Sequence, residues 1–248
     1  MKIDLSDQTA LVTGASRGIG RTIAQSLARA GADLVLMGRD QTSLEQLAQE
    51  LMSDGCNAEI AVCDVQDVPA IFRAIAGLPK LNILVNNAGT NIPEPFAQVS
   101  EEHFDQIINL NLRATFFVTQ AAVQKILSTG AGGAIINISS QMGHVGGTNR
   151  TVYCASKHAL EGFTKALALE LAPVGIRVVS VAPTFIETDM TRPMLADPAF
   201  EQSVISKIPL GHLGQPQDVA NAVVFLVSSH ARFVTGSSLL VDGGWTAQ

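Results

Sequence analysis

The sequence predicts an α/β fold in which seven parallel strands form one doubly wound sheet with helices on both faces. Seven short apolar runs alternate with helix-patterned segments along the 248 residues. These runs are nearly continuous in Val, Ile and Leu, as in parallel strands that are buried on both faces. Hydrophobic residues make up 47% of the chain and charged residues only 15%, a composition that suits many buried strands.

The expected strands follow one another without a linker, a low-complexity tract or an internal repeat. Right-handed crossovers connect successive parallel strands, so a single sheet accommodates all seven. Residues 1–248 are therefore expected to form one domain. The strands are TALVT at 9–13, DLVLM at 33–37, AEIAVCD at 58–64, LNILVNN at 81–87, GAIINISS at 133–140, IRVVSVAP at 176–183 and SSLLVDGG at 237–244.

Segment 188–207, TDMTRPMLADPAFEQSVISK, interrupts the alternation of strands and helices. Its two prolines and mixed polarity predict a short helical excursion rather than a crossover between strands. We expect this segment to form a lid over the substrate.

Charge and composition exclude several classes of protein. The net charge is −6 and no basic cluster is present, which argues against binding to a nucleic acid or an anionic membrane. No apolar run reaches the roughly 20 residues that a membrane span needs, and no apolar signal segment opens the chain. Cys56, Cys63 and Cys154 are odd in number and lack metal-ligand spacing. We therefore expect a cytoplasmic protein without disulfides or a metal.

A glycine-rich turn follows the first strand and opens a helix that begins near Ile19. In this segment, LVTGASRGIG, the glycines are Gly14, Gly18 and Gly20. Glycines at this point permit a tight turn and let the backbone approach a pyrophosphate at the positive end of the helix. The segment therefore predicts a dinucleotide site.

The end of the second strand predicts which dinucleotide binds. Segment VLMGRD places Arg39 where such folds contact the adenosine ribose, and Arg17 adds a second cation. An arginine here accommodates a 2′-phosphate, whereas a carboxylate would bind the 2′-hydroxyl. We expect NADP(H) to be favoured over NAD(H), although Asp40, one residue later, keeps NAD(H) open as an alternative.

Polar segments end the fourth and fifth strands, namely VNNAGT at 85–90 and NISSQMG at 137–143. Ligands of a parallel sheet bind beyond the carboxyl ends of its strands. We therefore expect both segments and the glycine-rich turn to face one crevice.

The only tyrosine of the chain lies in TVYCASKHALEG, residues 151–162. On a helix Tyr153 and Lys157 share one face, and we place the pair partly buried at the edge of an apolar stripe, with Glu161 and Lys165 exposed. An ammonium near a phenol lowers the phenol's pKa. This spacing predicts acid–base chemistry.

These segments together resemble the short-chain dehydrogenase/reductase superfamily over virtually the whole chain. The resemblance implies a Rossmann-type sheet and a reversible hydride transfer between a nicotinamide and an alcohol or carbonyl carbon, without a metal. The matching features, in order, are TGASRGIG, Asp64 with Val65, NNAG, Asn111 in NLNLR, Ser140, YCASK, Pro183 and VDGG.

By this resemblance Tyr153 is the general acid–base residue and Lys157 its electrostatic partner. Ser140 binds the substrate oxygen, and Asn111 belongs to a proton relay through water to the lysine. The family usually has glycine after the proline of strand six, where this chain has Thr184. The cofactor contacts that the resemblance implies are Gly14, Ser16, Arg17, Gly18, Ile19, Gly20, Arg39, Asp64, Val65, Asn87, Tyr153, Lys157, Ile186 and Thr188.

Polar residues between Ser140 and Tyr153 predict a hydrophilic substrate. This reading favours a sugar, polyol or sugar-acid dehydrogenase similar to gluconate 5-dehydrogenase. A 3-oxoacyl carrier-protein reductase shares the same motifs and stays open, as does a nucleotide sensor without catalysis. The predicted substrate contacts are Ser140, Gln141, His144, Arg150, Tyr153 and Arg192. The family usually forms tetramers, and the apolar segment ANAVVFLVSS fits a buried contact between subunits.

Overall fold

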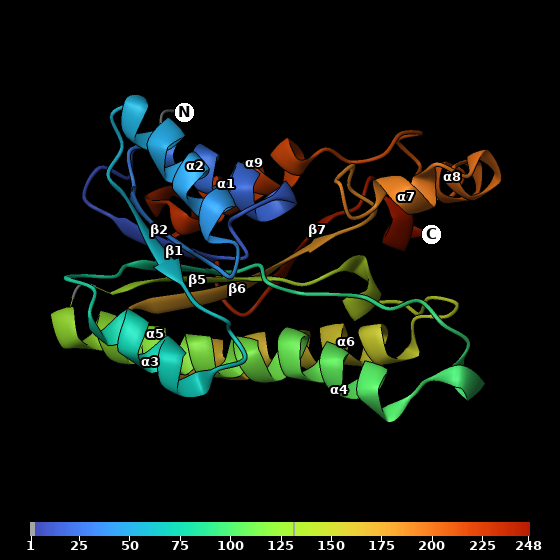
Figure 1. Cartoon of the computed structure of the whole chain (residues 1–248), viewed down its shortest axis with the longest axis horizontal. Helices are drawn as coiled ribbons and strands as arrows, with labels where there is room; N and C mark the ends of the chain where they lie inside the picture. The colour runs from blue at the N-terminus through green and yellow to red at the C-terminus, as the bar shows by residue number, and fades with distance from the viewer. Residues whose placement is uncertain (1–2, 131) are drawn as a thin grey trace.

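The computed structural model describes residues 3–130 and 132–248, so three residues of the predicted domain lie outside it. Its seven strands form one parallel sheet in the order β3-β2-β1-β4-β5-β6-β7 (Figure 1). The predicted fold class is confirmed. The strands are β1 (Thr9–Thr13), β2 (Asp33–Gly38), β3 (Ala58–Val62), β4 (Ile83–Asn86), β5 (Gly133–Ile138), β6 (Ile176–Pro183) and β7 (Ser238–Val241).

Helices cover both faces of the sheet (Figure 1). On one face α1 (Gly18–Arg29), α2 (Gln41–Ser53) and α9 (Pro216–Val227) pack against one hydrophobic cluster. On the other face α3 (Val68–Ala76), α5 (Thr115–Thr129) and α6 (Thr151–Leu171) pack against a second cluster, and α4 (Glu101–Ile108) lies in the same layer.

The two clusters explain why the strands are continuously apolar. Successive side chains of a strand point to opposite faces, so Ala10 and Val12 belong to the first cluster and Leu11 to the second. Neighbouring β4 divides in the same way, with Ile83 and Val85 on one side and Leu84 on the other. Because both faces are covered, every position of these two strands is buried, and apolar residues fill all of them except the strand ends at Thr9, Thr13 and Asn86.

The strand order reverses beside β1, which lies between β2 and β4. At such a switch point the crossovers on the two sides diverge and open a crevice beyond the carboxyl ends of the strands. The glycine-rich turn after β1 and the polar segments after β4 and β5 all reach this edge of the sheet. The topology therefore determines where a ligand site can form.

The helical segment that begins after Ser100 contains a change of helix type. Ser100 caps α4 by accepting a hydrogen bond from the backbone N–H of His103 at 3.1 Å. A π-helical segment, Asn109–Ala114, then follows before α5 begins. Such segments are rare and frequently lie at functional sites.

The segment at 188–207 forms the predicted helical excursion, with α7 (Arg192–Leu195) and α8 (Pro198–Ile205) to one side of the sheet (Figure 1). A third apolar cluster holds it, which includes Val204 and Ile208 and packs against Trp245 near the C-terminus. None of the helices in residues 3–130 and 132–248 is long and apolar enough to cross a membrane.

Candidate active site

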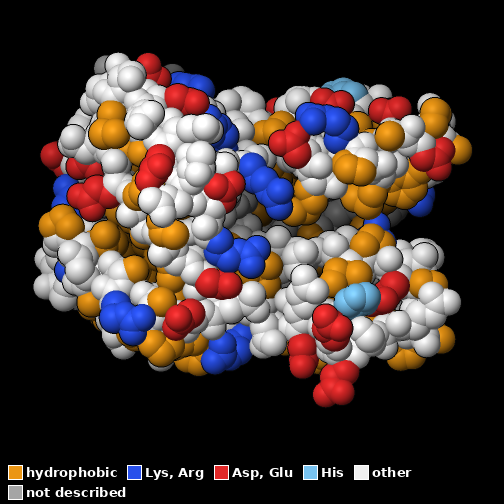
Figure 2. All heavy atoms as spheres, viewed as in Figure 1, with side chains coloured by type: hydrophobic (Ala, Val, Ile, Leu, Met, Phe, Trp, Pro, Cys, Tyr) orange, Lys and Arg blue, Asp and Glu red, His pale blue; other side chains and the backbone are white. Residues whose placement is uncertain are grey.

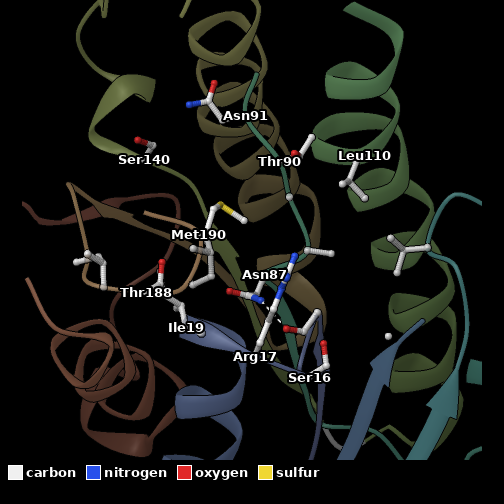
Figure 3. Close-up of a pocket in the computed structure, with 18 of the residues that line it drawn as sticks. Ser16, Arg17, Ile19, Asn87, Thr90, Asn91, Leu110, Ser140, Thr188 and Met190 are labelled. Carbon is white, nitrogen blue, oxygen red and sulfur yellow. Dashed lines mark hydrogen bonds between the residues drawn. The ribbon is translucent and has the colours of Figure 1, made fainter. Parts of the chain in front are cut away.

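A cavity of about 620 Å³ opens beyond the carboxyl ends of the strands. Figure 2 shows the surface hollowed between the α7–α8 segment and the layer of α4 and α6. In Figure 3, Ser140 and Asn91 lie toward one end of the cavity, and Ser16 and Arg17 toward the other. The predicted site residues that line it are Gly14, Ser16, Arg17, Gly18, Ile19, Arg39, Asp64, Val65, Asn87, Ser140, Tyr153, Lys157, Ile186 and Thr188.

The glycine-rich turn adopts a backbone path that other residues rarely follow. Gly14 and Gly18 have φ of +63° and +54°, in the left-handed region. A Cβ at Gly20 would collide with the carbonyl oxygen of Gly14 and the side-chain amide of Asn87. That amide donates to the carbonyl oxygens of Thr13 at 3.0 Å and Gly14 at 3.2 Å. Asn87 therefore holds the turn in place by hydrogen bonds, and the absence of a side chain at Gly20 allows this close packing.

The first turn of α1 presents backbone N–H groups at the cavity wall, where Gly18 and Ile19 lie. No side chain caps this end of the helix, and its first turn has no acidic residue. The orphan N–H groups and the helix dipole therefore favour an anion. Arg17, exposed at the N-cap position, adds a positive charge there.

Arg39 and Asp40, which connect β2 to α2, differ in their availability to a ligand. The Arg39 side chain is 74% exposed and lies 3.7 Å from the Asp64 carboxylate. Asp40 instead caps α2, because its carboxylate accepts from the hydroxyl of Ser43 at 2.6 Å and from its N–H at 3.1 Å. These hydrogen bonds lower the pKa of Asp40. The arginine is therefore free to meet a ligand, whereas the aspartate is already engaged.

Tyr153 lies half-buried in the cavity wall, and burial raises the pKa of its phenol. A hydrogen bond with the Ser140 side chain and the charge of Arg150 oppose this rise. The sequence predicted a lowered pKa, and that prediction is wrong for the protein without a ligand. The physical reason is that removal of the phenol from water disfavours the phenolate more than the nearby groups favour it.

Lys157 is more deeply buried than the sequence suggested, at 6% exposure. Its Nζ donates to the carbonyl oxygen of Ile138 at 2.9 Å and lies 5.5 Å from the centre of the Tyr153 ring. Burial lowers the pKa of Lys157 to about 8, and the Glu161 carboxylate opposes this effect. The ammonium is therefore held beside the phenol at a cost in hydration.

The predicted faces of α6 need correction. Glu161 was expected to be exposed, yet it is buried together with Ser156, Lys157 and Thr164. Charged side chains are seldom buried unless they are paired, so the pattern placed Glu161 at the surface. The structure supplies partners from β6 and β7, which the sequence of one helix does not reveal.

Asn111 lies in the π-helical segment and is fully enclosed. Its amide donates to the carbonyl oxygen of Thr90 at 2.9 Å and to Ser156 Oγ at 3.1 Å, and its Oδ1 accepts from the Thr90 N–H at 2.8 Å. A Cβ at Gly89 would lie 3.2 Å from Asn111 Oδ1 and 3.8 Å from Lys157 Nζ. Asn111 therefore ties the segment after β4 to α6, next to the lysine.

Four predicted substrate residues do not line the cavity. Gln141 is buried in the turn after β5, and His144 Nε2 lies 2.9 Å from Ser238 Oγ and 3.4 Å from Glu161 Oε1. Arg150 is buried against Met194, and exposed Arg192 pairs with Asp189 at 2.6 Å. Gln141 and His144 lie outside the cavity because the turn after β5 folds back against α6 and β7.

Three residues with unpaired buried oxygens line the cavity, and none of them was among the predicted site residues. Asn91 Oδ1, Ser139 Oγ and Thr184 Oγ1 are buried and have no hydrogen-bond partner among the described residues. Buried polar atoms are nearly always bonded, so an unpaired one requires an explanation. Asn91 follows NNAGT directly, and its place after a strand was the available signal. The described part of the chain contains no cluster of three metal-ligating side chains.

A glycine turn at the switch point of a parallel sheet, with a buried lysine beside a tyrosine and a serine, defines an oxidoreductase that uses a nicotinamide dinucleotide. Residues 14–246 match a short-chain dehydrogenase/reductase family model described as enoyl-(acyl carrier protein) reductase. The chain therefore belongs to the short-chain dehydrogenase/reductase superfamily and acts on alcohol or carbonyl groups.

Similar proteins span the full length of the chain. L-xylulose reductase of Bos taurus is 39% identical over 248 residues, which is 100% of both chains. The 3-oxoacyl-[acyl-carrier-protein] reductase of Rickettsia bellii is 41% identical over 242 residues, 98% of each. A crystal structure of gluconate 5-dehydrogenase from Burkholderia cenocepacia, in complex with NADP and tartrate, is 33% identical with a TM-score of 0.96, over 100% of this chain and 98% of that one.

The titration of Tyr153 can be measured without a reporter, because the chain has one tyrosine. Since burial raises its pKa, the ultraviolet tyrosinate signal of the ligand-free native protein should appear at higher pH than in denaturant. Ser140→Ala removes the hydrogen bond that favours the phenolate, so it should move the native midpoint further up. A native midpoint at or below the denatured one would contradict the burial of the phenol.

Proposed function

We propose that the chain transfers a hydride reversibly between NADP(H) and a secondary alcohol or ketone of a small polyhydroxylated substrate, such as a sugar, polyol or sugar acid. The arrangement of Tyr153 carries this proposal. Its ring centre lies 5.5 Å from Lys157 Nζ, the Ser140 side chain acts to lower the pKa of its phenol, and all three residues line the same cavity as the glycine-rich turn. These groups can move a proton at one end of a dinucleotide site.

Alcohol oxidation requires loss of the hydroxyl proton as the hydride leaves carbon. We assign Tyr153 as the group that accepts this proton, and in the reverse direction donates it. Ser140 would bind the reacting oxygen and hold it within reach of the phenol. Lys157 would stabilise the phenolate without itself acting as the base. The bound nicotinamide would supply the acceptor or donor of the hydride.

The residues present fit a dinucleotide. The close contact at Gly20 and the uncapped start of α1 form a cradle for a pyrophosphate. We assign Asp64 and Val65 to the adenine, and Ile186 with Thr188 to the nicotinamide amide, all of which line the cavity. Lys157 has two N–H donors besides the one bound to Ile138, and these would serve the ribose.

We assign Asn111 to a water-mediated proton path toward Lys157. Both donors of its amide are used by Thr90 and Ser156. Its side-chain Oδ1 accepts one hydrogen bond, from the Thr90 N–H, and retains acceptor capacity for a water molecule. Its enclosure beside Gly89 would hold that water close to the lysine.

The preference for NADP(H) rests on the different states of Arg39 and Asp40. Exposed Arg39 is available for a 2′-phosphate, and Arg17 lies on the same cavity wall. The Asp40 carboxylate caps α2 through its hydrogen bonds with Ser43, so a ribose 2′-hydroxyl would have to compete with Ser43 for it. NADP in the Burkholderia cenocepacia structure supports the same choice.

A polar substrate would satisfy the three unpaired oxygens of the cavity, on Asn91, Ser139 and Thr184. Hydroxyl groups of a sugar or polyol can donate to each. The names of the xylulose and gluconate relatives support this substrate class. Residues 188–191 line the cavity, so the segment at 188–207 is placed to act as a lid over such a substrate.

A homo-oligomer would cover apolar side chains that this chain exposes. Phe104, Phe116 and Leu127 are exposed on α4 and α5, and Leu169 is exposed on α6. Large apolar side chains that gather on an exposed surface often belong to an interface. We propose a cytoplasmic homotetramer.

The alternative function is reduction of 3-oxoacyl groups on a carrier protein, favoured by the 41% identity to the Rickettsia bellii reductase. That activity calls for an apolar acyl channel and a basic surface for an acidic partner. The face in Figure 2 instead intersperses acidic and basic side chains. Assay of a panel of polyols, aldoses, aldonic acids and 3-oxoacyl thioesters with both cofactors distinguishes the two functions, since turnover confined to thioesters would overturn the sugar proposal.

Tyr153→Phe should lower kcat at least about 100-fold, because it removes the only proposed proton donor and acceptor. NADPH affinity, measured by fluorescence, should stay within about twofold because the ring can still pack. A Phe variant that retained substantial turnover would show that another group transfers the proton.

Arg39→Ala should weaken NADPH binding about 10- to 100-fold, as expected for loss of a charge-assisted contact, and should leave NADH binding nearly unchanged. The matched control is Arg21→Ala, since Arg21 is bound to Glu50 and does not line the cavity. Equal weakening of both cofactors, or a preference of the unaltered protein for NADH, would contradict the role of Arg39.

Asn91→Leu should lower kcat/KM for a polyhydroxylated substrate by about 2- to 10-fold, the effect of one lost hydrogen bond. A small ketone that lacks further hydroxyls should be reduced as before, and NADPH affinity should not change. If the variant lost the same factor on both substrates, Asn91 would serve the structure of the site rather than recognition of the substrate.

A further inference from the structure

Glu161 is a buried carboxylate that no step of the proposed reaction uses. It lies on α6, one turn after Lys157, and is 5% exposed. It accepts hydrogen bonds from Ser180 Oγ at 2.7 Å and from Ser238 Oγ at 3.4 Å, and its Oε1 lies 3.4 Å from His144 Nε2. Burial of a carboxylate is costly unless donors surround it. These partners explain how the carboxylate is tolerated, but not what it does.

The surroundings place Glu161 close to the lysine. Residues four apart on a helix are neighbours on one face. Lys157 is hydrogen-bonded to Ile138 at the end of β5, and Glu161 is hydrogen-bonded to Ser180 on β6. Ser180 pairs across the sheet with Asn137, the residue before Ile138. The two charged side chains therefore lie over adjacent positions of neighbouring strands.

The turn after β5 closes this region from water. A Cβ at Gly143 would lie 3.0 Å from the carbonyl oxygen of Lys157 and 3.1 Å from Glu161 Cγ. Only a glycine lets the turn pack so closely on α6 at this point. Charges in such a low-dielectric setting interact more strongly than charges at the surface.

The charged and titratable groups around Lys157 come from few elements. Tyr153 and Glu161 lie on α6 itself, and His144 stands beyond Glu161 in the turn after β5. Asn111, from the π-helical segment, carries no charge. Burial lowers the pKa of Lys157 to about 8, and Glu161 acts in the opposite direction.

We propose that Glu161 is a positioning residue whose buried carboxylate keeps Lys157 protonated at neutral pH, and that Ser180, Ser238 and His144 hold this carboxylate in place. His144 then acts on the site through Glu161, not by contact with substrate. The inference rests on the proposed acid–base pair of Tyr153 and Lys157, since a neutral lysine amine would no longer stabilise the phenolate.

The test is Glu161→Gln, which keeps the shape of the side chain and removes its charge. In ligand-free protein that carries ¹³C-labelled lysine, the Lys157 resonance, assigned by its absence in Lys157→Met, should titrate about one pH unit lower than in the unaltered protein. The alkaline limb of the kcat profile should move to lower pH in the same direction. Glu170→Gln, an exposed change on the same helix, should move neither.

Glu161→Asp retains the charge, so its Lys157 titration and its kcat profile should lie close to those of the unaltered protein. If Glu161 were needed only for packing, the Gln and Asp variants would behave alike. Circular dichroism and thermal unfolding establish that each variant is folded. If the Gln variant fails to fold, the Lys157 titration of the Asp variant is compared with that of the unaltered protein instead. Unchanged Lys157 titration in a folded Glu161→Gln protein would overturn the proposal. The NMR titration does not depend on turnover, so failure of the proposed function, seen as an active Tyr153→Phe variant, is distinguishable from failure of this inference.

Discussion

Burial of the Lys157 ammonium at the end of β5 is the constraint on which the rest of the site depends. An ammonium removed from water loses hydration and tends to become neutral, so the surrounding structure must supply compensation. The carbonyl oxygen of Ile138 accepts one of its hydrogen bonds, and Glu161 supplies the opposite charge. Tyr153 lies half-buried beside it and also loses hydration. This loss favours the neutral phenol and therefore raises the pKa of Tyr153. The geometry therefore brings together two groups whose charged forms stabilise each other.

A buried network of amides fixes the strands and helices that hold this pair. Asn86 on β4 donates to Asn137 on β5 at 2.9 Å and to Thr119 on α5 at 2.8 Å. Asn137 in turn donates to Thr164 on α6 at 2.9 Å. The amide donors of this network are paired, although Asn86 Oδ1 has no partner among the described residues. Hydrogen bonds in a low-dielectric interior favour one arrangement, because a shift that broke them would leave further buried groups unpaired. The sheet edge and both helices are thus set relative to one another before any ligand binds.

Much of the fold follows from local pattern. Continuous apolar strands alternating with helices predicted the parallel sheet, and the glycine-rich turn predicted the start of α1 at its edge. The place of the candidate site was predictable to the same extent, because Ser140 follows β5, Tyr153 lies in the first turn of α6 and the glycine-rich turn follows β1, all at one edge of the parallel sheet. The turn after Ser140 was not predictable in this way. Which way a short polar turn faces depends on what packs against it, and here α6 and β7 draw His144 away from the cavity.

The sequence by itself determined the order of the elements and the position of the glycine-rich turn, because periodicity and backbone freedom are local properties. It also supplied the residues that we propose to transfer a proton. The tertiary structure decided how deeply those groups are buried and what pairs with them. Glu161 has the sequence context of a surface residue, and only the approach of Ser180 and Ser238 from distant strands permits its burial. The pKa shifts of Tyr153 and Lys157 follow from the same burial. Loss of hydration depends on all the neighbours of a group at once, and those neighbours are assembled only when the chain folds.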